Sequence, residues 1–226
     1  MPAILCVSAH PDDEAFGPAG TLAKYAATGV PVDLLTLTRG QRGTQLPHAD
    51  TPEALGQLRT YETRASAAVL GIRNATILDY MDGDLDKVAV DELAGHIARA
   101  IDQGAIDTVI GMGPLGLTRH TDHIASHHAM LRAAERSSRD LRVFYVAVDG
   151  EWVKQLNIDG PEARPTHDID TTGYFEKKLA ALACHSSQED SRQFFAMLAE
   201  NRQRVEWFHR ARPPYTDPQR ATDLFA

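Results

Sequence analysis

The sequence predicts an α/β fold in which a mostly parallel sheet carries helices on both faces. Strand-like and helix-like segments alternate from residue 3 to about residue 150, as expected when each strand is followed by a helix that covers the sheet. The chain has 226 residues, of which 43% are hydrophobic, and this is enough for one domain with a sizeable core. Two polar clusters follow strand-like runs, which is where ligands of such sheets bind.

The expected strands are short runs rich in aliphatic side chains. They comprise residues 3–7, 32–38, 76–78, 108–112 and 141–148. Polar or glycine-containing turns follow two of them, at residues 82–84 (Asp-Gly-Asp) and residues 113–116 (Gly-Pro-Leu-Gly). Residues 38–50 are polar and glycine-rich, so this segment predicts a loop.

The expected helices carry apolar side chains at helical spacing. They comprise residues 19–28, 52–70, 90–103, 120–137, 174–183 and 191–208. The second has the clearest ends: Thr51 is the expected N-cap, Pro52 occupies the first helical position, and Gly71 follows the last turn. These signals fix where the long helix begins and ends.

The pattern changes after residue 149. The chain is loop-rich through residue 170, and Pro213-Pro214 ends regular structure. We therefore expect a single domain over residues 1–226, with a core at about residues 3–150. A loop and helical C-terminal part, residues 151–226, is expected to pack on that core.

Charge and cysteine content exclude several classes of partner and environment. The net charge of −8 and the pI of about 5.6 argue against binding to nucleic acid or an anionic membrane. Only Cys6 and Cys184 occur, so a disulfide framework is not expected. No secretory signal and no run of membrane-spanning length is evident, and we expect a cytoplasmic protein. The tail, with Trp207 and Tyr215, could serve an interface in a homo-oligomer.

The two polar clusters are the strongest functional signal. Residues 10–14 read His-Pro-Asp-Asp-Glu and follow the first strand, and residues 119–123 read Arg-His-Thr-Asp-His and follow the fourth. Charged groups beside buried strands need compensation, and a divalent cation is the usual one. The clusters therefore predict one metal site assembled from two distant loops.

Zinc accepts histidine nitrogen and aspartate oxygen, and catalytic zinc sites commonly use three protein ligands plus water. We expect His10 and Asp13, three residues apart on a turn, and His123, at the start of a helix, to bind one Zn²⁺ per chain. The same donors also accept Fe²⁺ or another divalent ion. The identity of the metal is therefore left open.

The remaining members of the clusters could supply acid–base chemistry. Asp12 stays free beside the metal and is the expected general base. His120 could stabilise an oxyanion or protonate a leaving amine, and Asp122 could hold that imidazole in one tautomer. Glu14 is either a partner of these groups or a charge that favours a helix start.

Substrate contacts are expected from side chains near these clusters. Arg42 and Arg59 could grip a polar or anionic group, because a guanidinium binds carboxylate or phosphate with two hydrogen bonds. Alternatively, both are surface side chains or partners of Glu62. His185 lies at the end of a predicted helix, where it borders the pocket or serves the helix end.

These residues carry a family resemblance. Residues 9–14 (Ala-His-Pro-Asp-Asp-Glu), 120–123 (His-Thr-Asp-His) and 185–188 (His-Ser-Ser-Gln) resemble the PIG-L/LmbE-type zinc N-deacetylases, and so does the helix at residues 58–71. The resemblance runs from the first strand to about Gln188. It implies a Rossmann-like fold and hydrolysis of an N-acetyl group from an amino sugar.

The resemblance also implies roles for individual residues. It assigns zinc to His10, Asp13 and His123, the general base to Asp12, and oxyanion or acid catalysis to His120. The chain departs from the family at Thr121, where proline is frequent. It also departs in the loop at residues 38–43, which lacks the acidic residue that relatives often carry there. The second departure weakens any assignment of substrate by analogy.

The sequence therefore predicts a metal-dependent deacetylase acting on a small N-acetylglucosamine-type conjugate. An alternative within the hydrolases is an amidase that cleaves a larger thiol-sugar amide. A different class is a non-catalytic nucleotide- or sugar-binding module on a Rossmann-like sheet. No Gly-x-Gly-x-x-Gly follows the first strand, and the acids found there would repel a pyrophosphate.

Overall fold

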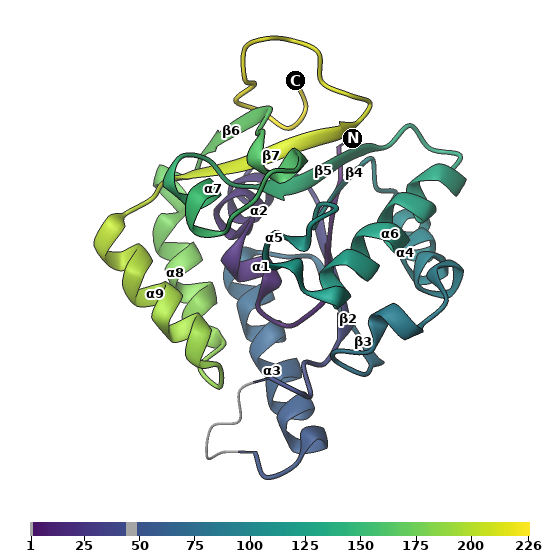
Figure 1. The fold of residues 1–226 in the computed structure, drawn as a ribbon, viewed down its shortest axis with the longest axis vertical. Helices are drawn as coiled ribbons and strands as arrows, with labels where there is room; N and C mark the ends of the chain where they lie inside the picture. The colour runs from purple at the N-terminus through teal and green to yellow at the C-terminus, as the bar shows by residue number, and fades with distance from the viewer. Residues whose placement is uncertain (1, 44–48) are drawn as a thin grey trace.

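The computed structural model describes residues 2–43 and 49–226, so part of the loop predicted at residues 38–50 lies outside it. Within the described chain, one seven-stranded sheet has the order β3-β2-β1-β4-β5-β7-β6 (Figure 1). Its strands are β1 (Ile4–Ser8), β2 (Val32–Thr38), β3 (Asn74–Tyr80), β4 (Thr108–Gly111), β5 (Arg142–Ala147), β6 (His167–Asp170) and β7 (Val205–Arg212). This confirms the predicted α/β class.

Helices connect and cover these strands. The α-helices are α1 (Asp13–Phe16), α2 (Ala19–Ala27), α3 (Pro52–Leu70), α4 (Val90–Gly104), α5 (Gly116–Arg119), α6 (Thr121–Arg136), α7 (Glu151–Gln155), α8 (Phe175–Cys184) and α9 (Glu189–Asn201). Three short 3-10 turns are η1 (Leu85–Lys87), η2 (Pro161–Ala163) and η3 (Thr172–Tyr174). The capping signals of α3 are confirmed: Thr51 Oγ1 accepts from Ala54 N at 3.2 Å, and Gly71 adopts φ 80°.

The order of the strands creates a switch point between β1 and β4. The strands β1, β2 and β3 pair in parallel toward one edge, and the chain then crosses to β4 and β5, which continue in parallel on the other side of β1. Neighbouring connections therefore leave in opposite directions, so a crevice opens at the carboxyl ends of β1 and β4. The turns after both strands meet there.

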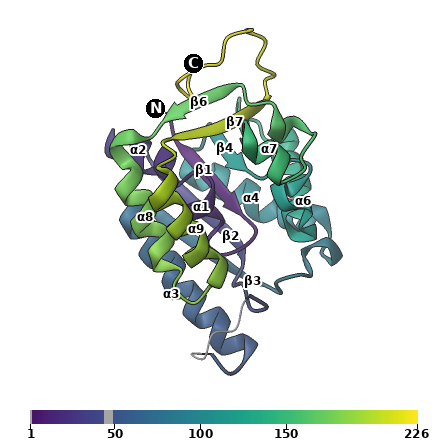
Figure 2. The ribbon, with the colours of Figure 1, turned by 60° about the vertical axis from the view of Figure 1, so that its left-hand side comes forward.

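Two helical layers bury the sheet (Figures 1 and 2). In β1, Leu5 and Val7 pack with α4 and α6, whereas Ile4 and Cys6 pack with α2, α3 and α8 on the opposite face. Because successive strand residues point to opposite faces, a strand covered on both sides is apolar at every position. The continuous apolar run that predicted β1 follows from this burial.

The C-terminal part corrects the sequence prediction. The helix expected over residues 191–208 ends as α9 at Asn201, and Arg202 follows with φ 50°. Residues 205–212 instead form β7, which pairs antiparallel with β5 and with β6. Glu206 and Phe208 are buried whereas Trp207 between them is half-buried, the two-residue period of a strand. The tail therefore completes the sheet as well as covering it.

None of the described helices combines the length and apolar character that crossing a membrane requires.

Candidate metal centre

Two loops at the switch point bring the predicted metal ligands together. His10 lies in the turn after β1 and Asp13 begins α1, whereas His123 lies in the first turn of α6. All three side chains are buried, each with 8% of its surface exposed. One ligand atom from each lies within 4.8 Å of the others.

The spacing of these atoms fits a tetrahedral ion. His10 Nδ1 lies 3.2 Å from His123 Nε2, and His123 Nε2 lies 3.3 Å from Asp13 Oδ1. Ligands bound about 2.0–2.1 Å from zinc at tetrahedral angles are about 3.3 Å apart. His123 therefore stands at the separation from both other donors that a shared ion requires, and His10 and Asp13 offer ligand atoms within 4.8 Å of each other.

Hydrogen bonds on the far side of each group turn an acceptor atom toward this centre. His123 Nδ1 faces the carbonyl oxygen of Gly116 at 2.9 Å, so Nδ1 carries the hydrogen and Nε2 a lone pair. Asp13 Oδ2 accepts from the backbone N–H groups of Ala9 and His10, both at 2.9 Å, which leaves Oδ1 free to bind. Lone pairs that face one another repel unless a cation lies between them, and a cation is what this arrangement fits.

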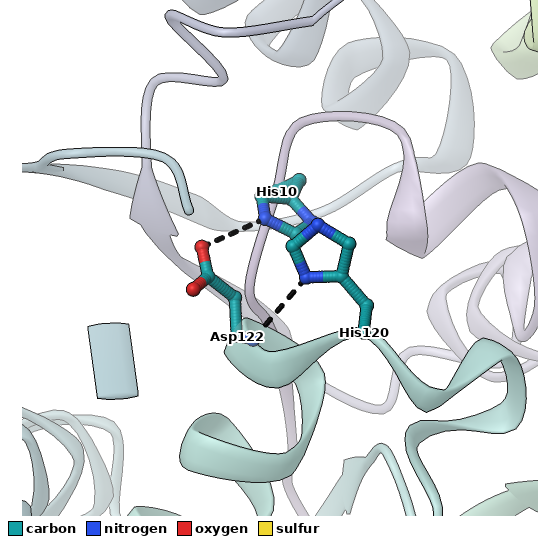
Figure 3. Close-up of side chains that lie close together, drawn as sticks. All are labelled: His10, His120 and Asp122. Atoms are coloured by element: carbon teal, nitrogen blue, oxygen red, sulfur yellow. Dashed lines mark hydrogen bonds and ion pairs between the residues drawn. The ribbon is translucent and has the colours of Figure 1, made fainter. Parts of the chain in front are cut away.

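His10 is oriented by two carboxylates. Its Nε2 lies 3.1 Å from Asp122 Oδ2 (Figure 3). It also lies 3.2 Å from Asp82 Oδ1, so Nε2 carries the hydrogen and Nδ1 the lone pair. Asp122 is itself fixed, because its carboxylate accepts the backbone N–H groups of Gly83 at 2.7 Å and Leu85 at 3.0 Å.

This geometry corrects the sequence prediction for Asp122. The prediction placed its carboxylate on the imidazole of His120, but the carboxylate contacts His10. Only the backbone N–H of Asp122 reaches His120, donating to Nδ1 at 3.2 Å where His120 caps α6 (Figure 3). Asp122 is fully buried beside the candidate ligand His10.

His120 lies at the exposed side of the site, with its ring edge-on to that of His10 at 4.6 Å between centroids. Because Nδ1 accepts from the helix backbone, the neutral ring carries its hydrogen on Nε2. Partial burial and the nearby His10 lower the pKa of His120, which favours that neutral form. The residue can therefore donate a hydrogen bond from Nε2.

Asp12 lies beside the candidate ligands and is held by Arg59. Its backbone adopts φ 94°, a conformation that non-glycine residues rarely take, and its carboxylate Oδ2 accepts from Arg59 Nη2 at 2.9 Å. Burial raises the pKa of Asp12 to about 7, and the charge of Arg59 opposes this rise. A cation at the adjacent donors would lower it from there.

Arg59 occupies a different position from the one expected of a substrate clamp. It is 4% exposed, and its guanidinium also donates to the carbonyl oxygens of Gly40 at 2.9 Å and Pro11 at 2.7 Å. These contacts tie the turn that carries Asp12 to α3. Arg59 therefore positions Asp12, although the edge of its side chain lines the pocket.

His185, expected either at the pocket border or at a helix end, is the C-terminal cap of α8, is fully buried and does not line the pocket. Its Nε2 lies 2.7 Å from Glu14 Oε1, which also accepts from Ser66 Oγ at 2.6 Å. The second carboxylate oxygen of Glu14 accepts from Asp12 N at 3.2 Å. Glu14 thus braces the turn at Asp12 from below, and His185 is the partner that compensates its buried charge rather than a substrate contact.

Arg42 lies at the rim of the pocket and is engaged by acids. Its guanidinium donates to Asp84 at 2.8 Å and 3.1 Å and to the carbonyl oxygen of Asp82 at 2.8 Å. The pocket it borders has a volume of about 580 Å³ and contains the metal donors at its polar end. Arg42 therefore lies where a ligand in the pocket could contact it, but its guanidinium is already paired with Asp84.

Some pocket residues escaped the sequence analysis. Asp82 was read as part of a turn, although it follows β3 at the same edge of the sheet as His10, and that position was the available signal. The buried ion pair of Lys178 and Glu206, at 2.7 Å, also lines the pocket. Nothing in the sequence indicated this ion pair, because Glu206 lies in a segment that was predicted to be helical.

A mostly parallel α/β sheet with a buried His-Asp-His donor set at its switch point defines a Rossmann-like protein with a candidate single-metal centre. The comparison with protein families agrees with this class: residues 5–134 match the PIG-L model, described as GlcNAc-PI de-N-acetylase. The matched segment is more than half of the chain and includes both polar clusters. The chain belongs to the PIG-L family.

Relatives of similar length are deacetylases by name. A 1D-myo-inositol 2-acetamido-2-deoxy-alpha-D-glucopyranoside deacetylase from Streptomyces avermitilis is 28% identical, over 98% of this chain and 96% of the relative. A probable N-acetyl-alpha-D-glucosaminyl L-malate deacetylase 2 from Bacillus anthracis is 29% identical, over 92% of each chain. Both names describe removal of an acetyl group from a glucosamine conjugate.

Solved structures share the fold but differ in reaction. The N,N'-diacetylchitobiose deacetylase from Pyrococcus horikoshii matches with a TM-score of 0.73 and 22% identity, over 92% of this chain and 83% of that one. The 4-carboxy-2-hydroxymuconate hydratase GalB from Pseudomonas putida matches with a TM-score of 0.75 and 21% identity, over 96% and 99%. At these identities the likeness shows the fold alone.

Proposed function

We propose that this protein is a metal-dependent hydrolase that removes the N-acetyl group from an N-acetylglucosamine-type conjugate. The observation that carries the proposal is the convergence of His10 Nδ1, His123 Nε2 and Asp13 Oδ1 beside the carboxylate of Asp12. The names of the relatives supply the acetamido sugar as the substrate class. The low cysteine content supports the cytoplasm as the compartment in which this protein acts.

The metal would be held by His10, Asp13 and His123. Zinc is the ion we propose, because a two-histidine, one-carboxylate set is typical of zinc hydrolases, and Fe²⁺ fits the same donors. When bound, the ion would polarise the amide carbonyl of the substrate. It would also lower the pKa of a water molecule bound to it toward neutrality. The contacts of Asp122 and Asp82 with His10 would keep its lone pair aimed at the ion.

Asp12 is the proposed general base. Its carboxylate is 7% exposed and lines the pocket, and it lies next in sequence to the ligand Asp13. The hydrogen bond from Arg59 occupies one side of Oδ2 and holds the group in place. In this proposal Asp12 takes a proton from the attacking water and keeps it available for the leaving amine.

His120 is the proposed oxyanion donor. Its Nδ1 is occupied as the cap of α6, so the neutral ring offers Nε2–H to a ligand in the pocket. This arrangement favours a hydrogen bond to the developing oxyanion over delivery of a proton, which would require the charged ring. Of the two roles left open by the sequence, the geometry supports the first.

The test is hydrolysis by metal-loaded protein. We expect zinc-loaded protein to release acetate and a free amine from an N-acetylglucosamine conjugate, and Asp12→Asn to retain zinc while losing at least about a hundredfold in kcat. Release of a larger acid, with acetamido sugars left intact, would establish the amidase alternative. Failure of the zinc- and iron-loaded protein to cleave any amide would overturn the hydrolase proposal.

A further inference from the structure

The pocket extends from the metal donors onto an apolar wall. Side chains from α1, α7, α9 and β7 form this wall: Phe16, Trp152, Phe194, Leu198 and Trp207. We call these five residues the aromatic wall. The whole pocket, at about 580 Å³, lies within the roughly 300–1,000 Å³ range of pockets that enclose drug-sized ligands. An acetyl group at the donors would leave most of this volume to the rest of the substrate.

The aromatic wall presents mainly apolar ring surface. The rings of Phe16 and Phe194 stack at 4.8 Å between centroids, and Trp152 lies 6.1 Å from Phe194. The indole N–H of Trp152 is already used, donating to Gln203 at 2.7 Å. The two phenylalanines and both tryptophans are half-buried, so part of each ring remains open to a ligand.

The charges of the pocket disfavour an anionic ligand. Among the residues that the structure describes, the lining contains three lysine or arginine side chains, and each is paired: Arg59 with Asp12, Lys178 with Glu206, and Arg42 with Asp84. Five carboxylates line the same pocket: Asp12, Asp13, Asp82, Asp190 and Glu206. Beyond the metal donors, whose negative charge a bound ion would offset, a carboxylate or phosphate on the ligand would meet Asp190 or displace an existing ion pair, at a cost in affinity.

We infer that the amino sugar cleaved by this protein carries an uncharged, apolar aglycone that packs on the aromatic wall. The inference rests on the proposed deacetylase function, which places the acetamido group at the metal donors. An aryl or alkyl group would remove apolar ring surface from water, whereas a carboxylate or a polyol would gain little there. The wall then acts as a specificity determinant for the group attached to the sugar.

The experiment compares three α-glycosides of N-acetylglucosamine, with methyl, phenyl and carboxymethyl aglycones, on the zinc-loaded protein. We expect kcat/KM for the phenyl glycoside to exceed that of the methyl glycoside by about tenfold or more. The carboxymethyl glycoside should be the poorest of the three. Phe194→Ala and Trp152→Ala should each remove most of the advantage of the phenyl glycoside over the methyl glycoside.

The matched control is Phe195→Ala. Phe195 is the next residue of α9, is also half-buried and packs against the core, but does not line the pocket. This variant removes the same side chain from the same helix, so it should keep the preference for phenyl. Equal loss of the preference in Phe194→Ala and Phe195→Ala would assign the effect to helix stability and overturn the inference.

A binding measurement separates this inference from the proposed function. Both tryptophans of the chain belong to the wall, so intrinsic fluorescence reports its occupation in the zinc-loaded Asp12→Asn variant. Tighter binding of the phenyl glycoside than of the carboxymethyl glycoside would support the role of the aromatic wall in binding an apolar aglycone. If no compound were hydrolysed at the same time, only the deacetylase proposal would fail.

Two outcomes overturn the inference while the deacetylase function stands. One is hydrolysis of the methyl and phenyl glycosides at equal efficiency together with equal binding. The other is a gain from a longer acyl group, with N-octanoylglucosamine preferred over phenyl N-acetylglucosaminide and the preference lost in Phe194→Ala. That result would show that the wall receives the acyl chain.

Discussion

The guanidinium of Arg59 donates to Asp12 Oδ2 at 2.9 Å, and both side chains are buried beside the candidate metal centre. Arg59 belongs to α3, whereas Asp12 lies in the turn after β1, so the contact joins two elements that are far apart in the sequence. The same guanidinium holds the carbonyl oxygen of Pro11 at 2.7 Å. The position of the proposed base therefore depends on a residue that the sequence analysis offered as a substrate contact, a surface side chain or a partner of Glu62.

The first prediction concerns this contact. Arg59→Lys keeps the charge but cannot reach Asp12, Pro11 and Gly40 together, because an ammonium lacks the planar fork of a guanidinium. We expect kcat to fall by up to about a hundredfold with little change in KM. Arg64→Lys, on the exposed side of the same helix, is the control and should retain full activity. A rise in KM with unchanged kcat would return Arg59 to a role in substrate binding.

The second prediction concerns the support of His10. Asp122→Asn weakens the hydrogen bond that keeps the hydrogen of His10 on Nε2, so zinc affinity should fall about tenfold to hundredfold. Competition with a chromophoric chelator measures this affinity. Asp84→Asn removes a carboxylate that pairs with Arg42 and Lys87 outside the donor set, and it should leave the affinity unchanged. Equal zinc affinity in Asp122→Asn and the unaltered protein would contradict this role.

The third prediction concerns stability against pH. Burial lowers the pKa of both His127 and His167 to about 4 in the folded protein, from about 6.5 when unfolded. Between these values the unfolded chain binds protons that the folded protein does not. The contribution of these two histidines to the free energy of unfolding is therefore fully present above pH 6.5 and is lost as the pH falls toward 4. Each histidine contributes about 3 kcal/mol to this loss.

Urea unfolding at pH 7.5 and pH 4.5 measures the effect. The variants His127→Gln and His167→Gln carry no titrating group at these sites, so each should reduce the difference in free energy of unfolding between the two pH values. An unchanged difference in both variants would mean that other groups cause the acid-induced loss.

The fourth prediction concerns His185. His185→Ala leaves the carboxylate of Glu14 buried without its cationic partner, so the free energy of unfolding should fall by about 3–5 kcal/mol. Because His185 does not line the pocket, KM should stay within threefold at a temperature where the variant is folded. A tenfold rise in KM at unchanged stability would show that His185 contacts the substrate after all.

Much of the fold was predictable because strands that are buried on both faces of the sheet appear in the sequence as continuous apolar runs. The apolar runs of β1 and β2 and the capping residues of α3 are local signals, and the structure confirms them. The strand β7 was not predictable from its own residues. The alternation of buried and exposed residues in β7 is short, and the strand follows α9 closely. Its strand conformation also depends on pairing with β5, which lies more than fifty residues earlier in the chain.

The site was predictable to the extent that its residues cluster in sequence. His10 and Asp13 share one turn, and His123 lies at the matching end of another strand, so the topology alone brings them close. The partners of buried charges were not predictable in this way. Contacts such as Asp122 with His10, and His185 with Glu14, depend on the packing of distant elements. The sequence therefore placed Asp122 beside the wrong imidazole, and for His185 it indicated the helix end but not the contact with Glu14.

The most direct test of the account is to locate the metal by anomalous scattering in crystals of the zinc-loaded protein. We predict one ion per chain, bound at about 2.0–2.2 Å by His10 Nδ1, His123 Nε2 and a carboxylate oxygen of Asp13. An ion bound instead by His10 together with His120 and Asp122, the other group of donors in this region, would contradict the account.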